Sequence, residues 1–169
     1  MTFKTALVAC LLIVLTGCQA VSYQPAGFRG GYSERPLEDG RYRVSYSGNG
    51  SVTLEKAIDF AMLRSAVLAK QNGADYFETT EHTAKVNRVY LGTPGVYGDK
   101  PSVVVKIKPL KSAKEAAGRV NLKQCAMFNV IFRMLQYSDK SPQYTHSAAN
   151  CIEEIKTKYQ LKDTQIFLD

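Results

Sequence analysis

The chain has 169 residues, a formal net charge of +7 at pH 7 and 45% hydrophobic residues. This length suits one domain with a modest core, so a second domain is not expected. The basic residues are scattered rather than gathered in one run, which argues against nucleic acid as a partner and favours anionic lipid headgroups or glycans. A mixed, solvated surface is the alternative explanation of the same charge.

The N-terminus has the pattern of a bacterial lipoprotein signal. Lys4 provides a basic start, an apolar run covers residues 6–15, and the letters LTGC at residues 15–18 form a lipobox. The apolar run is shorter than the roughly 20 residues that span a bilayer, so residues 1–17 are predicted to be a cleaved signal peptide. Cys18 then begins the mature chain and carries two or three acyl chains that anchor it to a membrane. A secreted protein with a chance cysteine is the alternative.

The residue after this cysteine indicates which membrane holds the anchor. Gln19 stands where Asp would favour retention in the inner membrane of enteric bacteria. We therefore expect the periplasmic face of the outer membrane, with the inner membrane as the less favoured location. Residues 18–40 are rich in Gly, Ser, Pro and charge and are predicted to be a lipidated tether, whose aromatic residues imply that part of it docks on the domain.

The first regular elements are expected after residue 40. Residues 41–47 alternate, with Tyr42, Val44 and Tyr46 on one face, and predict a strand. A helix is predicted over residues 53–72, because Thr53 can cap it and no Pro or Gly interrupts the pattern before Gly73.

Arg64 falls on the apolar side of this helix, beside Phe60 and Leu68, whereas Asp59 falls on the polar side. A guanidinium in such surroundings is expected to meet a carboxylate or several carbonyl groups. Arg64 is therefore predicted to form a structural ion pair or to extend its charge to the surface, with ligand binding as the alternative. A buried arginine paired with a carboxylate favours the structural role, and an arginine that opens into a pocket favours a ligand.

Two further strands are predicted at residues 75–83 and 102–108. The glycines and prolines between them predict an irregular connection or a long hairpin, either of which offers a surface to a partner. On a regular strand His82, Glu78 and Thr80 would share one face and form a weak candidate metal site. An exposed histidine among strand carboxylates is the ordinary alternative.

The C-terminal part is predicted to be a linker at 111–118 followed by helices at 121–136 and 147–159. The first of these helices is so apolar that it must be buried or bind a partner. Cys125 and Cys151 remain after the signal cysteine is removed and Cys18 is acylated, and their pairing would staple a helical hairpin by on the order of 3 kcal/mol. Two separately buried thiols are the alternative. A metal site is not expected, because two cysteines without nearby histidines are too few ligands for zinc.

Four short motifs follow one another in the first half of the chain: GYSE at 31–34, YRVSYSGN at 42–49, LRSA at 63–66 and GADYF at 73–77. As a set, over about residues 15–80, they resemble a family of small proteobacterial lipoproteins of unknown function in which a lipobox precedes the same pattern. The resemblance implies an α/β domain with an early strand–helix–strand unit and matches Arg64 to the family arginine. It implies no activity and no catalytic residue.

The elements together predict an α+β fold, with a strand–helix–strand–strand core at 41–110 and a C-terminal helical extension at 111–169 packed on it. No nucleophile elbow, zinc-protease, P-loop or dinucleotide-binding motif occurs, so neither an enzyme nor a cofactor is expected. The expected function is that of a non-enzymatic envelope lipoprotein with an accessory, sensor or structural role, partnered by an envelope protein or an anionic lipid or glycan. A small-ligand or metal-binding periplasmic domain centred on Arg64 or His82 is the alternative.

Overall fold

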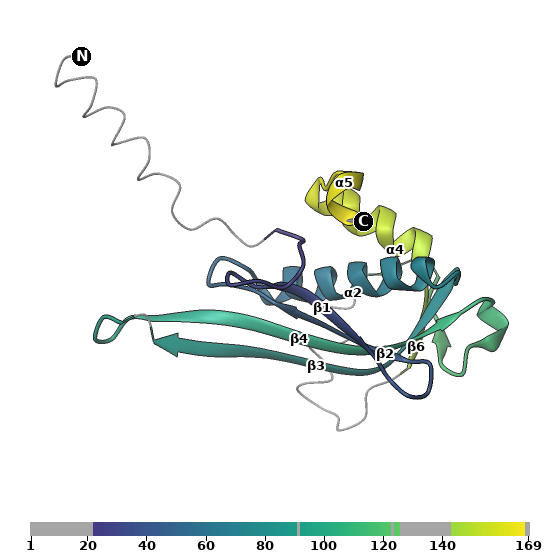
Figure 1. Ribbon diagram of the computed structural model, residues 1–169, viewed down its shortest axis with the longest axis horizontal. Coiled ribbons are helices and arrows are strands. Elements are labelled where there is room, and N and C mark those ends of the chain that lie inside the picture. The colour runs from purple at the N-terminus through teal and green to yellow at the C-terminus, as the bar shows by residue number, and fades with distance from the viewer. Residues whose placement is uncertain (1–21, 91, 123, 126–142, 168–169) are drawn as a thin grey trace, which may run out of the picture.

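The computed structural model describes residues 22–167 except 91, 123 and 126–142. Its strands form one sheet in the order β1-β2-β4-β3-β6-β5, in which neighbours are antiparallel except β5 and β6 (Figure 1). The strands are β1 Gly31–Pro36, β2 Tyr42–Ser47, β3 Tyr76–Tyr90, β4 Tyr97–Leu110, β5 Arg119–Val120 and β6 Tyr144–Ser147. The helices are α2 Leu54–Gln71, α4 Ala148–Tyr159 and α5 Asp163–Ile166, with a 3-10 turn, η1, at Ala113–Glu115. The predicted α+β class is confirmed.

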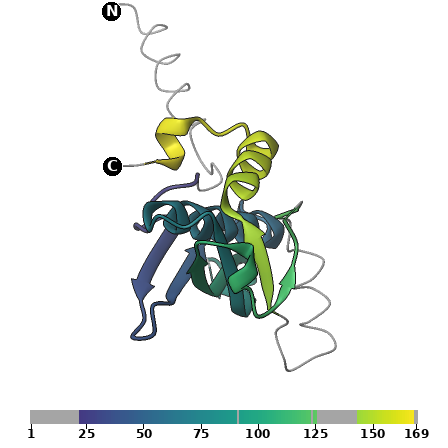
Figure 2. The same ribbon diagram turned by 90° about the vertical axis from the view of Figure 1, so that its right-hand side faces the viewer.

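The described helices lie on one face of the sheet. Figures 1 and 2 show α2 across the sheet and α4 on the far side of α2. Inward side chains of β2 and β4, among them Tyr46 and Val105, pack with α2 to form the core. Because α4 covers the side of α2 that faces away from the sheet, every residue of α2 from Ala57 to Ala69 is buried. Of the polar side expected on this helix, Asp59 is therefore buried, whereas Glu55 and Lys70 near the two ends stay exposed.

The ends of α2 follow from local chemistry as predicted. The Thr53 hydroxyl accepts a hydrogen bond from the backbone N–H of Lys56 at 3.1 Å, which satisfies one of the free donors of the first turn. Gly73 takes a φ of +69° after the last turn, a conformation that costs little without a Cβ.

The predicted tether, residues 18–40, is part of the fold from Tyr23 onward. Residues 31–36 form strand β1, which pairs antiparallel with β2. Tyr23 is 2% exposed and packs near Tyr32 and Phe60. The high content of Gly, Ser and Pro concealed this strand, because a polar edge strand needs only the neighbouring strand to pair with.

The connection between the second and third predicted strands is a long hairpin. β3 continues to Tyr90 and β4 begins at Tyr97, so the ladder runs well past both predicted boundaries. The turn between the two strands contains Gly92 and Gly95, both at positive φ, whereas Gly98 lies within β4. Figure 1 shows this hairpin projecting beyond the rest of the sheet.

The C-terminal part contributes to the sheet itself, so the predicted boundary at residue 111 does not separate a core from an extension. β6 pairs with β3 and leads directly into α4, whose N-cap is Ser147. Neither β5 nor β6 was predicted, because their partners lie far away in sequence. The apolar helix predicted at 121–136 falls mostly outside the described residues.

The described part of the C-terminal region contains the predicted disulfide. Cys125 and Cys151 are joined, with Cα atoms 4.8 Å apart. Cys151 lies in α4 as expected, whereas Cys125 lies in an irregular segment after β5 and not in a helix. The bond therefore fastens α4 to this segment.

The predicted signal peptide at 1–17 and the acylation site Cys18 lie outside the described residues. In the part of the chain that the structure describes, no helix is both long and apolar enough to cross a membrane.

Candidate functional site

Arg64 joins the helix layer to the edge of the sheet. Its guanidinium donates two hydrogen bonds to the carboxylate of Glu34 on β1, from Nε at 3.0 Å and from Nη2 at 2.5 Å. The Arg64 side chain is 8% exposed and that of Glu34 is 28% exposed. The guanidinium also lies over the ring of Tyr32, with its central carbon 4.5 Å from the ring centre. A buried arginine in a bidentate pair with a carboxylate at the sheet edge is the geometry that favours a structural role.

Tyr23 completes the surroundings of this guanidinium. Burial raises the pKa of Tyr23 above its ordinary value, while the nearby charge of Arg64 opposes that rise. The Tyr23 hydroxyl and Nη1 of Arg64 are both buried, and the guanidinium lies close enough to this hydroxyl to affect its pKa. Aromatic rings thus fill the space around the guanidinium.

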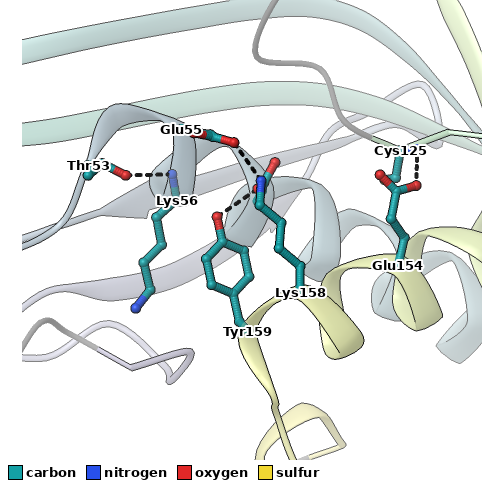
Figure 3. A network of polar contacts seen from close by, with 8 residues as sticks. Thr53, Glu55, Lys56, Cys125, Glu154, Lys158 and Tyr159 are labelled. Carbon is teal, nitrogen blue, oxygen red and sulfur yellow. Dashed lines mark hydrogen bonds and ion pairs between the residues drawn. The ribbon is translucent and has the colours of Figure 1, made fainter.

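A second polar cluster holds α4 against α2. Asp59, which the helical wheel placed on the polar side, is 1% exposed and accepts hydrogen bonds from Nζ of Lys158 and the hydroxyl of Tyr159, both at 2.7 Å (Figure 3). Lys158 also bonds Glu55 at 2.6 Å. Burial raises the pKa of Asp59 against the opposing effect of these two donors. Lys158 of α4 thus pairs with two carboxylates of α2, so this cluster holds the two helices together.

The disulfide lies beside a histidine that the sequence separates from Cys125. One ligand atom each from Cys125, Cys151 and His146 lie within 4.8 Å of one another, so the two cysteines do have a histidine nearby. Nδ1 of His146 is 3.3 Å from the carbonyl oxygen of Gln124, and the backbone N–H of Cys125 donates to Glu154 at 2.7 Å (Figure 3). Both sulfur atoms are committed to the disulfide, so the cluster as it stands offers no thiolate to a metal.

His82 and Glu78 do not share a face, contrary to the metal-site expectation. A β-bulge between Thr79 and Glu81 inserts one residue into β3 and reverses the alternation of side chains beyond it. Glu78 accepts hydrogen bonds from the backbone N–H groups of Ala117 and Gly118, at 3.0 and 2.5 Å. His82 instead pairs across from the core residue Val105, and burial together with the nearby His146 lowers the pKa of His82 to about 4.

The face of the sheet opposite the helices is basic. The register places Arg35 of β1 directly across from Arg43 of β2, and Arg43 directly across from Lys106 of β4. Lys106 pairs with Glu81 of β3 at 2.8 Å, and Lys85 lies further along β3 on the same face. We call Arg35, Arg43, Lys85 and Lys106 the basic face. The sequence contains these residues at scattered positions, and only the pairing of the strands brings them into one group.

The basic face contains a shallow depression of about 330 Å³. Its lining combines cations, hydroxyl groups and a single carboxylate: Arg43, Glu81, Thr83, Lys85, Ser102, Val104 and Lys106. Neither Arg43 nor Lys85 forms an ion pair with any described residue within 4.0 Å. Guanidinium, ammonium and hydroxyl donors around one hollow suit a phosphate or carboxylate group.

Comparisons of this chain with protein-family models, with curated proteins and with solved structures find no match.

Proposed function

We propose that this protein is a non-enzymatic envelope lipoprotein that binds anionic groups through its basic face. The ligand class is a phosphate or carboxylate carried by an envelope glycan, lipid or protein. Acylation of Cys18 holds the domain at the periplasmic face of the outer membrane, and the domain acts there as an accessory, sensor or structural component.

The observation that carries this proposal is the row formed by Arg35, Arg43 and Lys106. Like charges directly across from one another destabilise a pair of strands. Among the described residues that line the hollow beside Arg43 and Lys106, Glu81 is the only one with a carboxylate. A bound anion would offset the repulsion, so the arrangement is better explained by a ligand than by stability of the free domain.

The alternative function, a small-ligand or metal-binding domain centred on Arg64 or His82, has less geometric support. Arg64 is already bonded to Glu34, and the bulge in β3 separates His82 from Glu78. The basic face presents cations to solvent instead, where a polymeric ligand can reach them.

The test compares two double variants with the same change in net charge. In Arg43→Gln with Lys85→Gln, two exposed cations leave the hollow while the Lys106–Glu81 pair stays. In the control, Lys111→Gln with Lys114→Gln, two cations near η1 are lost. Binding of lipopolysaccharide and of soluble peptidoglycan fragments is measured by calorimetry at two salt concentrations.

We expect the hollow variant to lose about tenfold or more in affinity for at least one of these probes, since each cation near an anionic surface contributes about 1 kcal/mol. The control is expected to bind like the wild type, and the dependence on salt is expected to weaken only in the hollow variant. Equal losses in both variants would indicate nonspecific attraction to a mixed, solvated surface and would overturn the proposal.

A further inference from the structure

The predicted acyl anchor lies very close to a residue that is fixed in the core. Tyr23 is five residues after Cys18, and five extended residues span at most about 17 Å. Tyr23 packs against Tyr32 of β1 and Phe60 of α2, with ring centres 4.7 and 5.6 Å apart. If Cys18 is acylated as proposed, the domain therefore has no long tether and must rest directly on its membrane.

The position of Tyr23 determines which side of the domain lies nearest to the anchor. Tyr23 contacts α2, so the chain enters from the face of the sheet that carries the helices. The turn that follows returns through Gly30, which lies against the backbone of Ser47 at the end of β2, and this turn exposes Phe28 completely. Figure 1 shows this purple segment on the same side of the sheet as α2.

The β3–β4 hairpin projects from this end of the sheet. The ladder with β2 stops at Ser102 and the ladder with β6 stops at Thr79, so among the described strands only β3 and β4 continue to the tip. The backbone N–H of Gly48, just after β2, donates to the carbonyl of Pro101 at 2.9 Å. The entering segment and the base of the projecting hairpin are therefore neighbours.

The hairpin exposes aromatic and aliphatic side chains toward the helix side. Ala84 and Val103 are buried on that face, and strand alternation places Val86, Tyr90 and Tyr97 on the same face further out. The rings of Tyr90 and Tyr97 are 5.9 Å apart. With Phe28 and Val96 they make five of the seven large hydrophobic side chains that are exposed in the described part of the chain. We call Phe28, Val86, Tyr90, Val96 and Tyr97 the aromatic patch.

We propose that the aromatic patch contacts the surface of the membrane that holds the acyl chains of Cys18. Tyrosine and phenylalanine suit the boundary between headgroups and hydrocarbon, because their rings are apolar and the tyrosine hydroxyl remains hydrated. Arg88 lies on the same face of the hairpin as the patch, 3.7 Å from Asp99, and Arg29 follows Phe28 in the chain, so both guanidinium groups can reach phosphate groups of the same membrane. The inference rests on the proposed acylation, and it directs the basic face away from this membrane, toward ligands of the periplasmic space.

A single tryptophan can test this contact, because the sequence contains none. The acylated Tyr97→Trp protein is reconstituted in vesicles of phosphatidylethanolamine and phosphatidylglycerol, with and without bromine-labelled acyl chains. Tyr97 is exposed, so the substitution should leave the fold intact. The matched control is Val120→Trp, since Val120 is similarly exposed on β5 and pairs with β6 at the end of β3 away from the tip.

We expect the emission of the Tyr97→Trp protein to shift to shorter wavelength and to be quenched by the brominated lipid at least about twofold more than that of the Val120→Trp control. Equal quenching of the two variants in acylated protein that floats with the vesicles would overturn the inference. Protection of the indole in Tyr97→Trp from aqueous acrylamide without quenching by lipid would also overturn it, since a second copy or another protein then covers the hairpin. If the wild-type protein incorporates no palmitate, or if its labelling persists in Cys18→Ser, the acyl anchor is refuted. The present inference then fails with it.

Discussion

At the scale of single residues, one cluster explains three positions of the short sequence motifs in the first half of the chain. Glu34 and Tyr32 of the GYSE motif contact Arg64 of the LRSA motif through a bidentate ion pair and a ring. Gly31 of the same motif has a φ of +129°, and a Cβ there would come within 2.5 Å of the carbonyl oxygens of Gln24 and Pro25. These positions are accounted for by the fold, without any need for a ligand.

Replacing Arg64 with Ala should therefore destabilise the protein. The change removes the ion pair, the contact with Tyr32 and the packing of the buried Arg64 side chain, at a cost of about 3 kcal/mol in the free energy of unfolding. Chemical denaturation measures this cost. Arg41→Ala is the control, because the pair between Arg41 and Asp39 is exposed and should contribute nothing measurable.

A double-mutant cycle with Glu34→Gln separates the ion pair from the other contacts of Arg64. An Arg64→Ala protein that unfolds like the wild type but loses binding of the anionic probes would contradict the structural role. It would then favour a ligand at Arg64.

At the scale of elements, the C-terminal part is held to the sheet by contacts between residues far apart in sequence. β6 pairs with β3, Asp59 of α2 receives two donors from α4, and the disulfide ties α4 to the segment after β5. A two-residue β5 has little stability of its own. We infer that the disulfide supplies much of the order of this region.

The double variant Cys125→Ser with Cys151→Ser should lose on the order of 3 kcal/mol of stability, as expected for a closed loop of this length. Denaturation of oxidised and reduced wild-type protein gives the same comparison without a substitution. Alkylation should modify both cysteines only after reduction. Free thiols in freshly isolated native protein would refute the bridge.

At the scale of the whole molecule, the domain has two chemically different sides. Helices, buried rings and the aromatic patch occupy one face of the sheet, and the basic face occupies the other. His82 of β3 lies close enough to His146 of β6 for the two imidazoles to interact. Burial lowers the pKa of each to about 4. Their protonation links the stability of the domain to pH.

Stability should fall as the pH drops from about 6.5 to about 4. In this window the unfolded chain binds protons at an ordinary histidine pKa of 6.5, whereas the folded chain resists protonation until about 4. For the fully buried His146 the difference corresponds to roughly 3 kcal/mol. Unfolding free energies of wild type and His146→Gln, measured across this range, test the effect. An equally steep decline in the variant would show that other groups control the acid sensitivity.

The sequence alone was enough to predict the elements whose signals are local. Strand β2 follows from alternation, α2 follows from its Thr53 cap and Gly73 stop, and the disulfide follows from the number of cysteines left after the lipobox. The apolar surroundings of Arg64 on the helical wheel also led correctly to a carboxylate partner. Each of these signals depends on residues within a few turns or on simple counting, so no knowledge of the tertiary contacts was needed.

The tertiary structure decided everything that depends on which strands pair. β1 was concealed in a tether-like composition, and β5 and β6 have partners distant in sequence. The bulge in β3 moved His82 to the face opposite Glu78, and α4 buried the supposedly exposed Asp59. The cations of the basic face come from strands on both sides of helix α2 in the sequence, and register alone aligns them. Because side-chain direction reverses with each residue of a strand, a single inserted residue or an unseen partner strand changes which groups meet, and hence which site the molecule presents.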